Sequence, residues 1–388
     1  MTGVKKRRGE EPGDLLAFLR LELGRRGRIT FYEYMKHVLY HPGFGYYTSG
    51  KGARHGEQDY YTSPGVSPYF GLALANLIAE YAKCFNRHER IALVEYGPGS
   101  GTLCRDILTT LHEEHPAIFS CCTYFLCEVS GRIPPVDKSL DHDFPGKIVV
   151  AEGGIDRNDA SLPVIILCNE LIDAFPVHRV IATGDGLMEL YVSESETGFQ
   201  EHPGPLSTDD IERYLAAHRI QPLPGRPFEV SLEGESWMRH ASERFERGSI
   251  IIGDYGYETE ELFNRMPDGS LMCYYRNQAH HDPFLHPGEE DITSHVDFSV
   301  LKRAGESAGL RTDAFLLQAD FLLSCGIMEA YQKIETLPLK EVEKYQRWME
   351  IRRLIDPEDM GSTFKFLVQS KGCEKNPLEG LRLKHFPR

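Results

Sequence analysis

Three glycines at alternate positions follow an acidic residue in the segment IALVEYGPGSGTL. The glycines are Gly97, Gly99 and Gly101, and the acid is Glu95. Because glycine has no Cβ, such a turn can adopt backbone angles closed to other residues and lets a ligand approach the main chain. The helical pattern that opens at Thr102 would place a helix N-terminus, with its unpaired N–H groups, beside that ligand. The segment predicts a strand, a tight turn and a helix that bind a small molecule; the alternative is a glycine-rich turn without a ligand.

The spacing of the glycines distinguishes between two kinds of nucleotide ligand. The dinucleotide fingerprint is G-x-G-x-x-G, whereas Thr102 occupies the sixth position here. Glu95 is unfavourable beside a pyrophosphate but suits a cationic ligand. The pattern E-x-G-x-G-x-G resembles the first motif of class I S-adenosylmethionine (SAM) methyltransferases, whose ligand carries an amino group and a sulfonium. The spacing therefore favours SAM over a nicotinamide dinucleotide.

Two further runs end in polar side chains that could complete a binding site. The run TYFLCEV ends at Glu128, where nucleotide-binding sheets hold ribose hydroxyls. Alone, Glu128 could equally be a surface acid. The run VIILC is followed at once by Asn169, Glu170 and Asp173, which would lie beside the cofactor at the carboxyl end of the sheet. Their alternative is structural, with Asn169 capping a helix and Glu170 solvated.

The elements that position these motifs predict an α/β fold with a parallel sheet and helices on both faces. Apolar runs predict strands near 91–97, 122–128, 147–151, 164–169, 249–254, 270–276, 313–318 and 363–369. Upstream lie two helical patterns over 14–39, a Gly-, Pro- and Tyr-rich loop over 41–68 and a helix over about 69–85. Residues 175–230 read as an insertion with a hairpin, a helix and a Pro-rich linker, placed to shape an acceptor pocket.

These elements divide the chain into four expected parts. They are an N-terminal helical cap with its loop (1–86), the first half of a Rossmann-like domain (87–174), the inserted segment (175–230) and the second half with C-terminal helices (231–388). A chain of 388 residues is long enough for one large elaborated domain or two packed ones.

Composition limits the class of protein. With 43 basic and 58 acidic residues the net charge is −15, which disfavours nucleic acid and favours a cationic partner. Nine cysteines without a Cys-x-x-Cys pair indicate a reducing compartment. No apolar run reaches the ~18 residues of a membrane span. The basic run at 5–8 has neither a signal-peptide nor a transit-peptide pattern, so we expect a cytoplasmic, bacterial protein of unknown oligomeric state.

The motifs taken together resemble the MidA-like family of methyltransferases. The matching segments are FGYYTS, DYYTSPGVSPYFG, EYGPGSGTL, CEVS, NELIDAFPVHR, GDYGY, LMCYYRNQAH and PGEEDITSHVDF, from about residue 29 to 370. Mitochondrial members of this family are protein arginine methyltransferases that assist assembly of respiratory complex I. The resemblance implies a Rossmann-like class I methyltransferase fold, SAM as cofactor, and symmetric dimethylation of an arginine on a complex I subunit.

The residues are compatible with that chemistry. A guanidinium stays protonated near neutral pH, and its planar fork is matched by carboxylates that accept paired hydrogen bonds. We therefore expect Glu170 and Asp173 to be the catalytic carboxylates. The expected cofactor-binding residues are Glu95, Gly97, Gly99, Gly101, Glu128 and Asn169. The acid that binds adenine is left open among Glu152, Asp156 and Asp159.

Other polar groups receive structural interpretations. Asp254, in GDYGY, could meet the acceptor or cap the turn that follows it, and the structural role is favoured. The histidines and acids of 277–295 match no zinc signature, so no metal is expected. Within that segment Asp291 is expected to start a helix that continues through Phe298, with His295 facing the site. Two roles are open for Tyr60, Tyr61, Thr62 and Ser63: a lid over the cofactor, which is favoured, or packing of the N-terminal helices on the sheet.

Three other functions compete with the arginine methyltransferase. The first is a SAM-binding assembly chaperone without catalysis, against which the intact Glu170 and Asp173 argue. The second is a small-molecule methyltransferase, although the long insertion and the acidic charge favour a protein substrate. The third is a nicotinamide oxidoreductase, which Thr102 disfavours because the dinucleotide turn requires glycine there.

Overall fold

The strands around the glycine turn assemble into one large sheet. The computed structural model describes residues 13–49, 63–86, 89–128, 139–152 and 162–385, and the sheet order is β15-β16-β10-β5-β2-β3-β4. The bounds are β2 Ile91–Tyr96, β3 Cys122–Glu128, β4 Ile148–Glu152, β5 Val164–Asn169, β10 Gly248–Tyr257, β15 Arg311–Leu317 and β16 Phe364–Lys371. Neighbours are parallel except β16, which runs antiparallel to β10 and β15. The predicted Rossmann-like α/β fold is confirmed.

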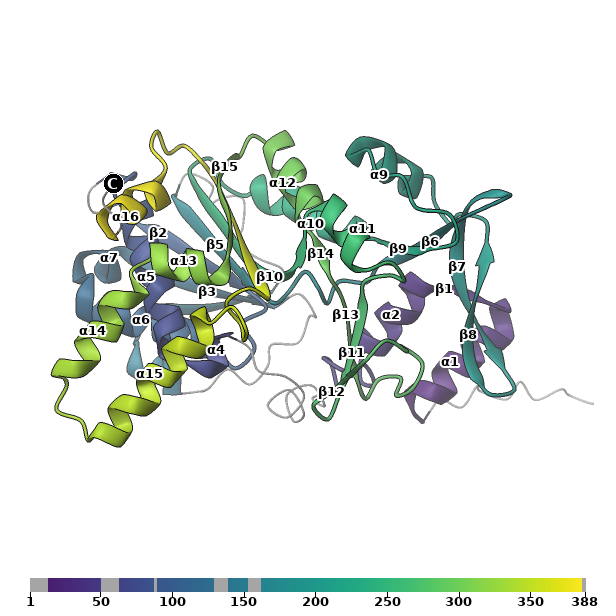
Figure 1. Cartoon of the computed structure of the whole chain (residues 1–388), viewed down its shortest axis with the longest axis horizontal. Coiled ribbons are helices and arrows are strands. Elements are labelled where there is room, and N and C mark those ends of the chain that lie inside the picture. The colour runs from purple at the N-terminus through teal and green to yellow at the C-terminus, as the bar shows by residue number, and fades with distance from the viewer. Residues whose placement is uncertain (1–12, 50–62, 87–88, 129–138, 153–161, 386–388) are drawn as a thin grey trace, which may run out of the picture.

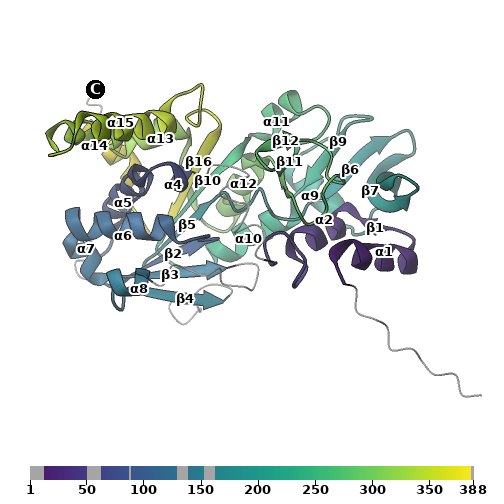
Figure 2. The same cartoon turned by 90° about the horizontal axis from the view of Figure 1, so that it is seen from below.

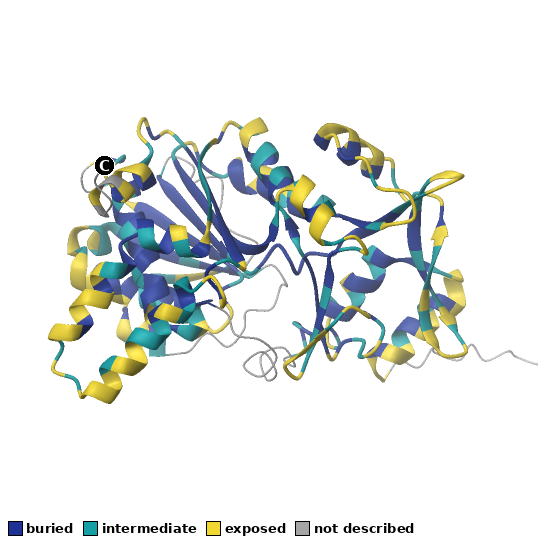
Figure 3. Cartoon of the chain, in the orientation of Figure 1, coloured by how far each residue is buried: buried dark blue, intermediate teal, exposed yellow. Residues whose placement is uncertain are grey.

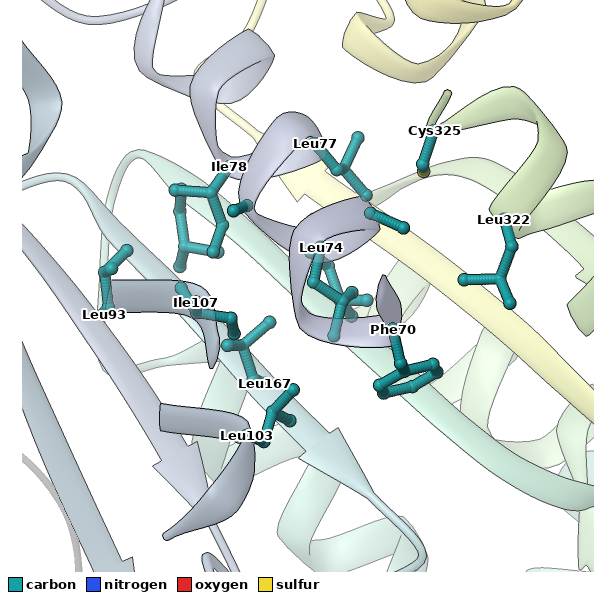
Figure 4. Close-up of a cluster of buried hydrophobic side chains, with 14 of the residues drawn as sticks. Phe70, Leu74, Leu77, Ile78, Leu93, Leu103, Ile107, Leu167, Leu322 and Cys325 are labelled. Atoms are coloured by element: carbon teal, nitrogen blue, oxygen red, sulfur yellow. The ribbon is translucent and has the colours of Figure 1, made fainter. Parts of the chain in front are cut away.

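Helices cover both faces of this sheet, because its central strands are apolar on both sides. One face packs against α5 (Pro68–Ala82), α6 (Thr102–Glu114), α13 (Gln318–Ser324), α14 (Ile327–Thr336), α15 (Glu341–Ile355) and α16 (Pro377–His385). The other packs against α10 (Leu232–Ser242) and α12 (Phe298–Ser307). In Figure 4, Leu74 and Ile78 of α5 lie beside Leu93 and Leu167 of the sheet. The central strands are buried, the edge strands β4 and β15 are partly exposed, and further exposed residues lie on the outer helix faces (Figure 3).

A second module lies beside the large sheet (Figures 1 and 2). Its five-stranded sheet consists of β1 (Ile29–Thr30), β6 (His178–Thr183), β7 (Gly186–Ser195), β8 (Gly198–Gly204) and β9 (Pro227–Val230). A three-stranded sheet consists of β11 (Leu271–Tyr275), β12 (Gln278–His280) and β13 (Asp291–Ser294). Helices α1 (Leu15–Arg26) and α2 (Phe31–Tyr40) complete it. We use "second module" for these two sheets with α1 and α2.

The second module joins the N-terminal helices to the inserted segment. Leu19 of α1 and Phe31 of α2 share one apolar cluster with Val192 of β7 and Ile292 of β13. A capping box, in which Thr30 and Glu33 bond each other's backbone N–H groups, fixes the start of α2. The hairpin and helix predicted within 175–230 are present as β6, β7 and α9 (Asp210–His218). The four domain boundaries themselves stay a prediction.

Two predictions about elements are wrong. The strand expected at 270–276 exists as β11, but it pairs antiparallel with β12 and β13 and not within the large sheet. Alternating apolar residues indicate a strand without indicating its partner, and Leu271 and Cys273 pack in the cluster with α1 and α2. Asp291 lies in a strand and does not start a helix. The following helix begins at Phe298, because Asp297 accepts N–H bonds at its start.

The remaining elements are short: α4 (Ser63–Val66), α7 (Pro116–Cys121), α8 (Ser139–Asp143), α11 (Thr259–Arg265) and β14 (Val296–Asp297), which extends β10. All nine cysteines are free thiols. None of the helices within the described ranges has the length and apolar character needed to cross a membrane.

Candidate active site

The glycine turn has the geometry that its sequence predicts. Gly97, Gly99 and Gly101 all have positive φ, at 69°, 52° and 82°. A Cβ on Gly97 would come within 2.9 Å of Leu171 Cδ1, whereas a Cβ on Gly99 would meet no atom within 4 Å. The turn leads directly into α6, for which Gly101 is the N-cap. Gly97 N donates to Cys127 O and Gly101 N to Pro98 O, so it is the open space beside Gly99 at the N-terminus of α6 that suits a small ligand such as SAM.

Glu95 lies below this turn in a buried position. Its side chain accepts a hydrogen bond of 2.8 Å from Tyr124 Oη, and only 4% of the residue is exposed. Burial raises the pKa of Glu95 to about 8. The Glu95 carboxyl lies on the face of the sheet that packs against α6, which carries Cys104. Burial raises the pKa of Cys104, and the charge of Glu95 raises it further. Cofactor binding by Glu95 stays a prediction.

Glu128 and Asn169 end strands on either side of β2. Glu128 is the last residue of β3 and Asn169 the last of β5, and both strands pair parallel with β2. The two side chains thus lie at the same edge of the sheet as the glycine turn. Asn169 Nδ2 donates to Glu170 Oε1 at 3.0 Å, so it orients the neighbouring carboxylate. Their roles toward the cofactor stay predictions. Of the adenine candidates, Glu152 ends β4, whereas Asp156 and Asp159 lie outside the described residues.

Glu170 is held in an unusual backbone conformation. Its φ is 50°, which is uncommon for a residue other than glycine. Its N–H donates to Gly253 O at 2.9 Å, and Oε1 also accepts a 3.3 Å bond from Ser63 N. Burial and the neighbouring Asp173 raise the pKa of Glu170 to about 8. Strained residues of this kind concentrate at functional sites.

Asp254 has a structural role. It is fully buried, and its Oδ2 accepts bonds from Ile172 N (3.1 Å) and Asp173 N (3.3 Å), while Oδ1 accepts from Tyr255 N at 2.9 Å. Burial and the charges of Asp173 and Glu170 raise its pKa well above the ordinary value. The expected structural role is confirmed, but Asp254 caps the loop after β5 and not the turn that follows β10.

Asp173 differs from Asp254 in its hydrogen bonding. It is 5% exposed, and its Oδ1 has no hydrogen-bond partner. The nearby Tyr255 hydroxyl gives its single hydrogen to Thr293 Oγ1, which in turn donates to Met272 O. Burial raises the pKa of Asp173 to about 6, against the lowering effect of Tyr255 and backbone N–H groups. Across the described ranges, Glu170, Asp173 and Asp254 form no ion pair with a lysine or arginine.

The second module reaches this loop through Tyr40, Tyr47 and Ser294, which the sequence analysis did not single out, and through Asp291, to which it gave another role. Tyr40 Oη donates to Ala174 O at 2.9 Å, and Ser294 N donates to Asp173 O at 2.8 Å. Tyr47 Oη donates to Asp291 Oδ1 at 2.6 Å, and its ring stacks on that of Tyr40. The signal was present in the family motifs FGYYTS and PGEEDITSHVDF, which contain Tyr47 and Asp291.

Other expected residues lie as follows. Ser63 approaches Glu170, whereas Tyr60, Tyr61 and Thr62 lie outside the described residues. His295 Nδ1 lies 3.0 Å from Ser270 O and its ring packs against Tyr255. Over the described ranges no three His, Cys, Asp or Glu side chains are arranged to hold a metal ion.

Comparisons with known proteins identify the family of this chain. Residues 73–316 match a family described as "Putative S-adenosyl-L-methionine-dependent methyltransferase". A Drosophila melanogaster relative, named as a mitochondrial protein arginine methyltransferase NDUFAF7 homolog, is 30% identical over 95% of this chain and 88% of its own length. The Homo sapiens protein named mitochondrial protein arginine methyltransferase NDUFAF7 is 26% identical over 93% of this chain and 85% of its own.

A solved structure of a similar protein contains a bound ligand. A superfamily member from Burkholderia thailandensis, bound to S-adenosyl-homocysteine, superposes with a TM-score of 0.81 at 29% identity and covers 94% of both chains. A native crystal structure of a superfamily protein from Burkholderia thailandensis superposes with a TM-score of 0.79 at 28% identity and covers 94% of this chain and 93% of its own. The cofactor of this protein is SAM. Its binding at the turn formed by residues 97–101 stays a prediction.

The comparisons correct one prediction. The cytoplasmic location expected from the sequence is wrong by this measure, because the curated relatives are named as mitochondrial proteins. The family profile matches more than half of the chain, and the relatives match nearly all of it. The chain therefore belongs to this family of SAM-dependent methyltransferases.

Proposed function

We propose that this methyltransferase acts on an arginine side chain of a protein, held by Glu170 and Asp173. The observation that carries the proposal is the unpartnered oxygen of Asp173, buried beside a second carboxylate. A buried carboxylate oxygen without a donor costs about 1–3 kcal/mol or more. An arginine guanidinium supplies planar N–H donors and a positive charge, which is what these two acids lack.

The chemistry follows from this placement. SAM supplies the methyl group: the sulfonium C–S bond breaks, its electron pair stays on sulfur to give S-adenosylhomocysteine, and an N–C bond forms on a guanidino nitrogen. One proton passes from that nitrogen to solvent. Glu170 and Asp173 fix the plane of the guanidinium and stabilise the charge that collects on the acceptor. Holding one nitrogen in line with the reacting methyl can contribute up to about 7–11 kcal/mol in well-oriented cases.

Methyl transfer to matched peptides tests the proposal. The protein is incubated with SAM and peptides that differ only in arginine or lysine, and products are identified by mass spectrometry. We expect methylarginine, no methyllysine, and a fall of about 100-fold or more in transfer by Glu170→Gln. Binding of S-adenosylhomocysteine by Glu170→Gln, measured by calorimetry, should stay within about twofold of wild type, since Gln retains the bond from Asn169. Unchanged transfer would remove Glu170 from the site.

The identity of the substrate protein is a further step of the proposal. The curated relatives are named protein arginine methyltransferases, and the family resemblance points to symmetric dimethylation of a respiratory complex I subunit. Cells lacking the protein should then lose a dimethylarginine from complex I. Cofactor binding without transfer to any peptide would favour an assembly chaperone, and transfer to free small molecules alone would favour a small-molecule methyltransferase.

A further inference from the structure

Asp291 lies on the strand of the second module that faces the acceptor loop. In β13, Ile292 packs into the cluster with α1 and α2. Because side chains alternate along a strand, Asp291 and Thr293 point to the opposite side. Thr293 there accepts the hydroxyl of Tyr255 from β10. Asp291 is 2% exposed, so β13 directs a buried carboxylate toward the large sheet.

The strand and the acceptor loop are joined by direct hydrogen bonds. Ser294 N donates to Asp173 O at 2.8 Å, and Tyr40 Oη donates to Ala174 O at 2.9 Å. The ring of Tyr40 stacks on Tyr47, whose hydroxyl binds Asp291. These contacts fix the position of Asp291 relative to Asp173, although the two residues belong to different modules.

Electrostatic interactions place Asp291 within range of the same site. Burial and Asp173 raise the pKa of Glu170, and Asp291 raises it further. Burial likewise raises the pKa of Tyr40, and the charges of Asp291 and Asp173 add to the effect. Tyr274 lies opposite Asp291 in the strand pairing. Burial raises the pKa of Tyr274, and the charges of Asp173 and Asp291 raise it further. Asp173 and Asp291 thus raise the pKa of the same two tyrosines, and Glu170 adds to the effect on Tyr274.

We propose that Asp291 is the third acidic contact of the substrate arginine, contributed by the second module opposite Glu170 and Asp173. This inference rests on the proposed function. Three carboxylates alone would not define a site; the buried Asp173 Oδ1 without a partner is the independent sign that a donor belongs there. A guanidinium has five N–H donors in one plane, enough to bond acids on two sides. Recognition of arginine therefore requires both modules.

The test compares a variant that removes the charge of Asp291 with one that removes its hydrogen bond to Tyr47. Asp291→Asn keeps an oxygen that can accept the Tyr47 hydroxyl but removes the charge. We expect the KM for the arginine peptide to rise about 10- to 100-fold, as for a lost bond to a charged group, while kcat falls less and S-adenosylhomocysteine affinity stays unchanged. Tyr47→Phe removes the hydrogen bond and leaves the charge, so it should raise KM by less than Asp291→Asn. The exposed acid Asp282 of the same module provides the control Asp282→Asn, which should behave as wild type.

Each outcome decides the inference. If wild type methylates arginine and Asp291→Asn leaves KM unchanged, Asp291 does not contact the substrate, although the proposed function stands. If Tyr47→Phe and Asp291→Asn raise KM equally, Asp291 acts only by holding Tyr47. If wild type binds S-adenosylhomocysteine but methylates no arginine, the proposed function and this inference both fall.

Discussion

Two buried aspartates at the end of the large sheet have opposite surroundings. Asp254 accepts three backbone N–H bonds, which use both of its oxygens. Asp173 has one oxygen without a donor. A fully bonded carboxylate stabilises the loop it caps, whereas an unbonded one is unfavourable until a donor arrives. This difference, which the sequence does not show, gives Asp254 a structural role and supports the proposal that Asp173 binds the substrate.

Glu95 gives a prediction about pH at the level of one residue. Its pKa is raised by burial from 4.5 to about 8, so between these values the folded protein retains a proton that the unfolded chain has lost. Stability must therefore fall as pH rises through this window, by up to a few kcal/mol. Glu95→Gln is neutral and can still accept the Tyr124 hydroxyl. Its unfolding temperature at pH 8 should exceed that of wild type by roughly several degrees.

The control for this experiment is acidic pH. Near pH 4.5 wild-type Glu95 is protonated in the folded state, so the two proteins should unfold at similar temperatures. Thermal scans from pH 4.5 to 8.5 give both comparisons. If the unfolding temperatures of wild type and Glu95→Gln changed equally with pH, Glu95 would be ionised in the folded protein.

Single residues of the site were predictable where a local pattern carries the signal. The glycine turn and the polar residues after β5 are adjacent in sequence, and the structure places them at one edge of the sheet. The contact between Tyr47 and Asp291 joins residues 244 positions apart. Neither residue has a local pattern that indicates this contact, so only the folded chain brings them to the site.

At the scale of elements, the turn between β2 and α6 predicts the effect of adding one methyl group. Gly99 has φ 52° and free space around its Cβ position. Gly99→Ala should cost about 1 kcal/mol of stability from the left-handed backbone, yet weaken S-adenosylhomocysteine binding about tenfold or more by occupying ligand space. Calorimetric titration and a thermal scan measure the two effects.

Gly146→Ala is the matched control. Gly146 also has a positive φ, 69°, and no atom within 4 Å of its Cβ position, but it lies in the turn before β4. It should lose similar stability without losing ligand affinity. Equal affinities for the two variants would place the ligand away from Gly99.

The sequence predicted the positions of the strands better than it predicted which strands pair with each other. Every strand expected from an apolar run is present, yet β11 pairs outside the large sheet. A strand pattern reports which side chains are buried and not what buries them. The helix expected at Asp291 failed for a related reason: Asp291 and Asp297 both resemble helix N-caps in sequence, and only Asp297 accepts the N–H bonds of a first turn.

At the scale of the whole molecule, the second module combines segments of the chain whose association the sequence could not predict. The buried Arg179 of β6 binds Glu229 of β9 and Glu201 of β8 and lies over the Phe31 ring of α2. Glu229 also accepts a bond from Ser270 N. Segments from three distant parts of the chain therefore meet around one ion-pair cluster. The net charge of −15 favours approach of a basic substrate segment to this assembly.

The central claim is that acids at the end of β5 bind a guanidinium. Proton release on substrate binding tests this claim most directly. Near pH 7, Glu170, with its pKa of about 8, is largely protonated in the absence of a cation, and a bound guanidinium lowers that pKa. Titration of an arginine peptide into the protein with S-adenosylhomocysteine is measured in two buffers of different ionisation enthalpy. The account predicts that the heat depends on the buffer, indicating release of a substantial fraction of a proton per peptide, and that Glu170→Gln loses most of this dependence. Binding of the peptide with the same heat in both buffers would contradict it.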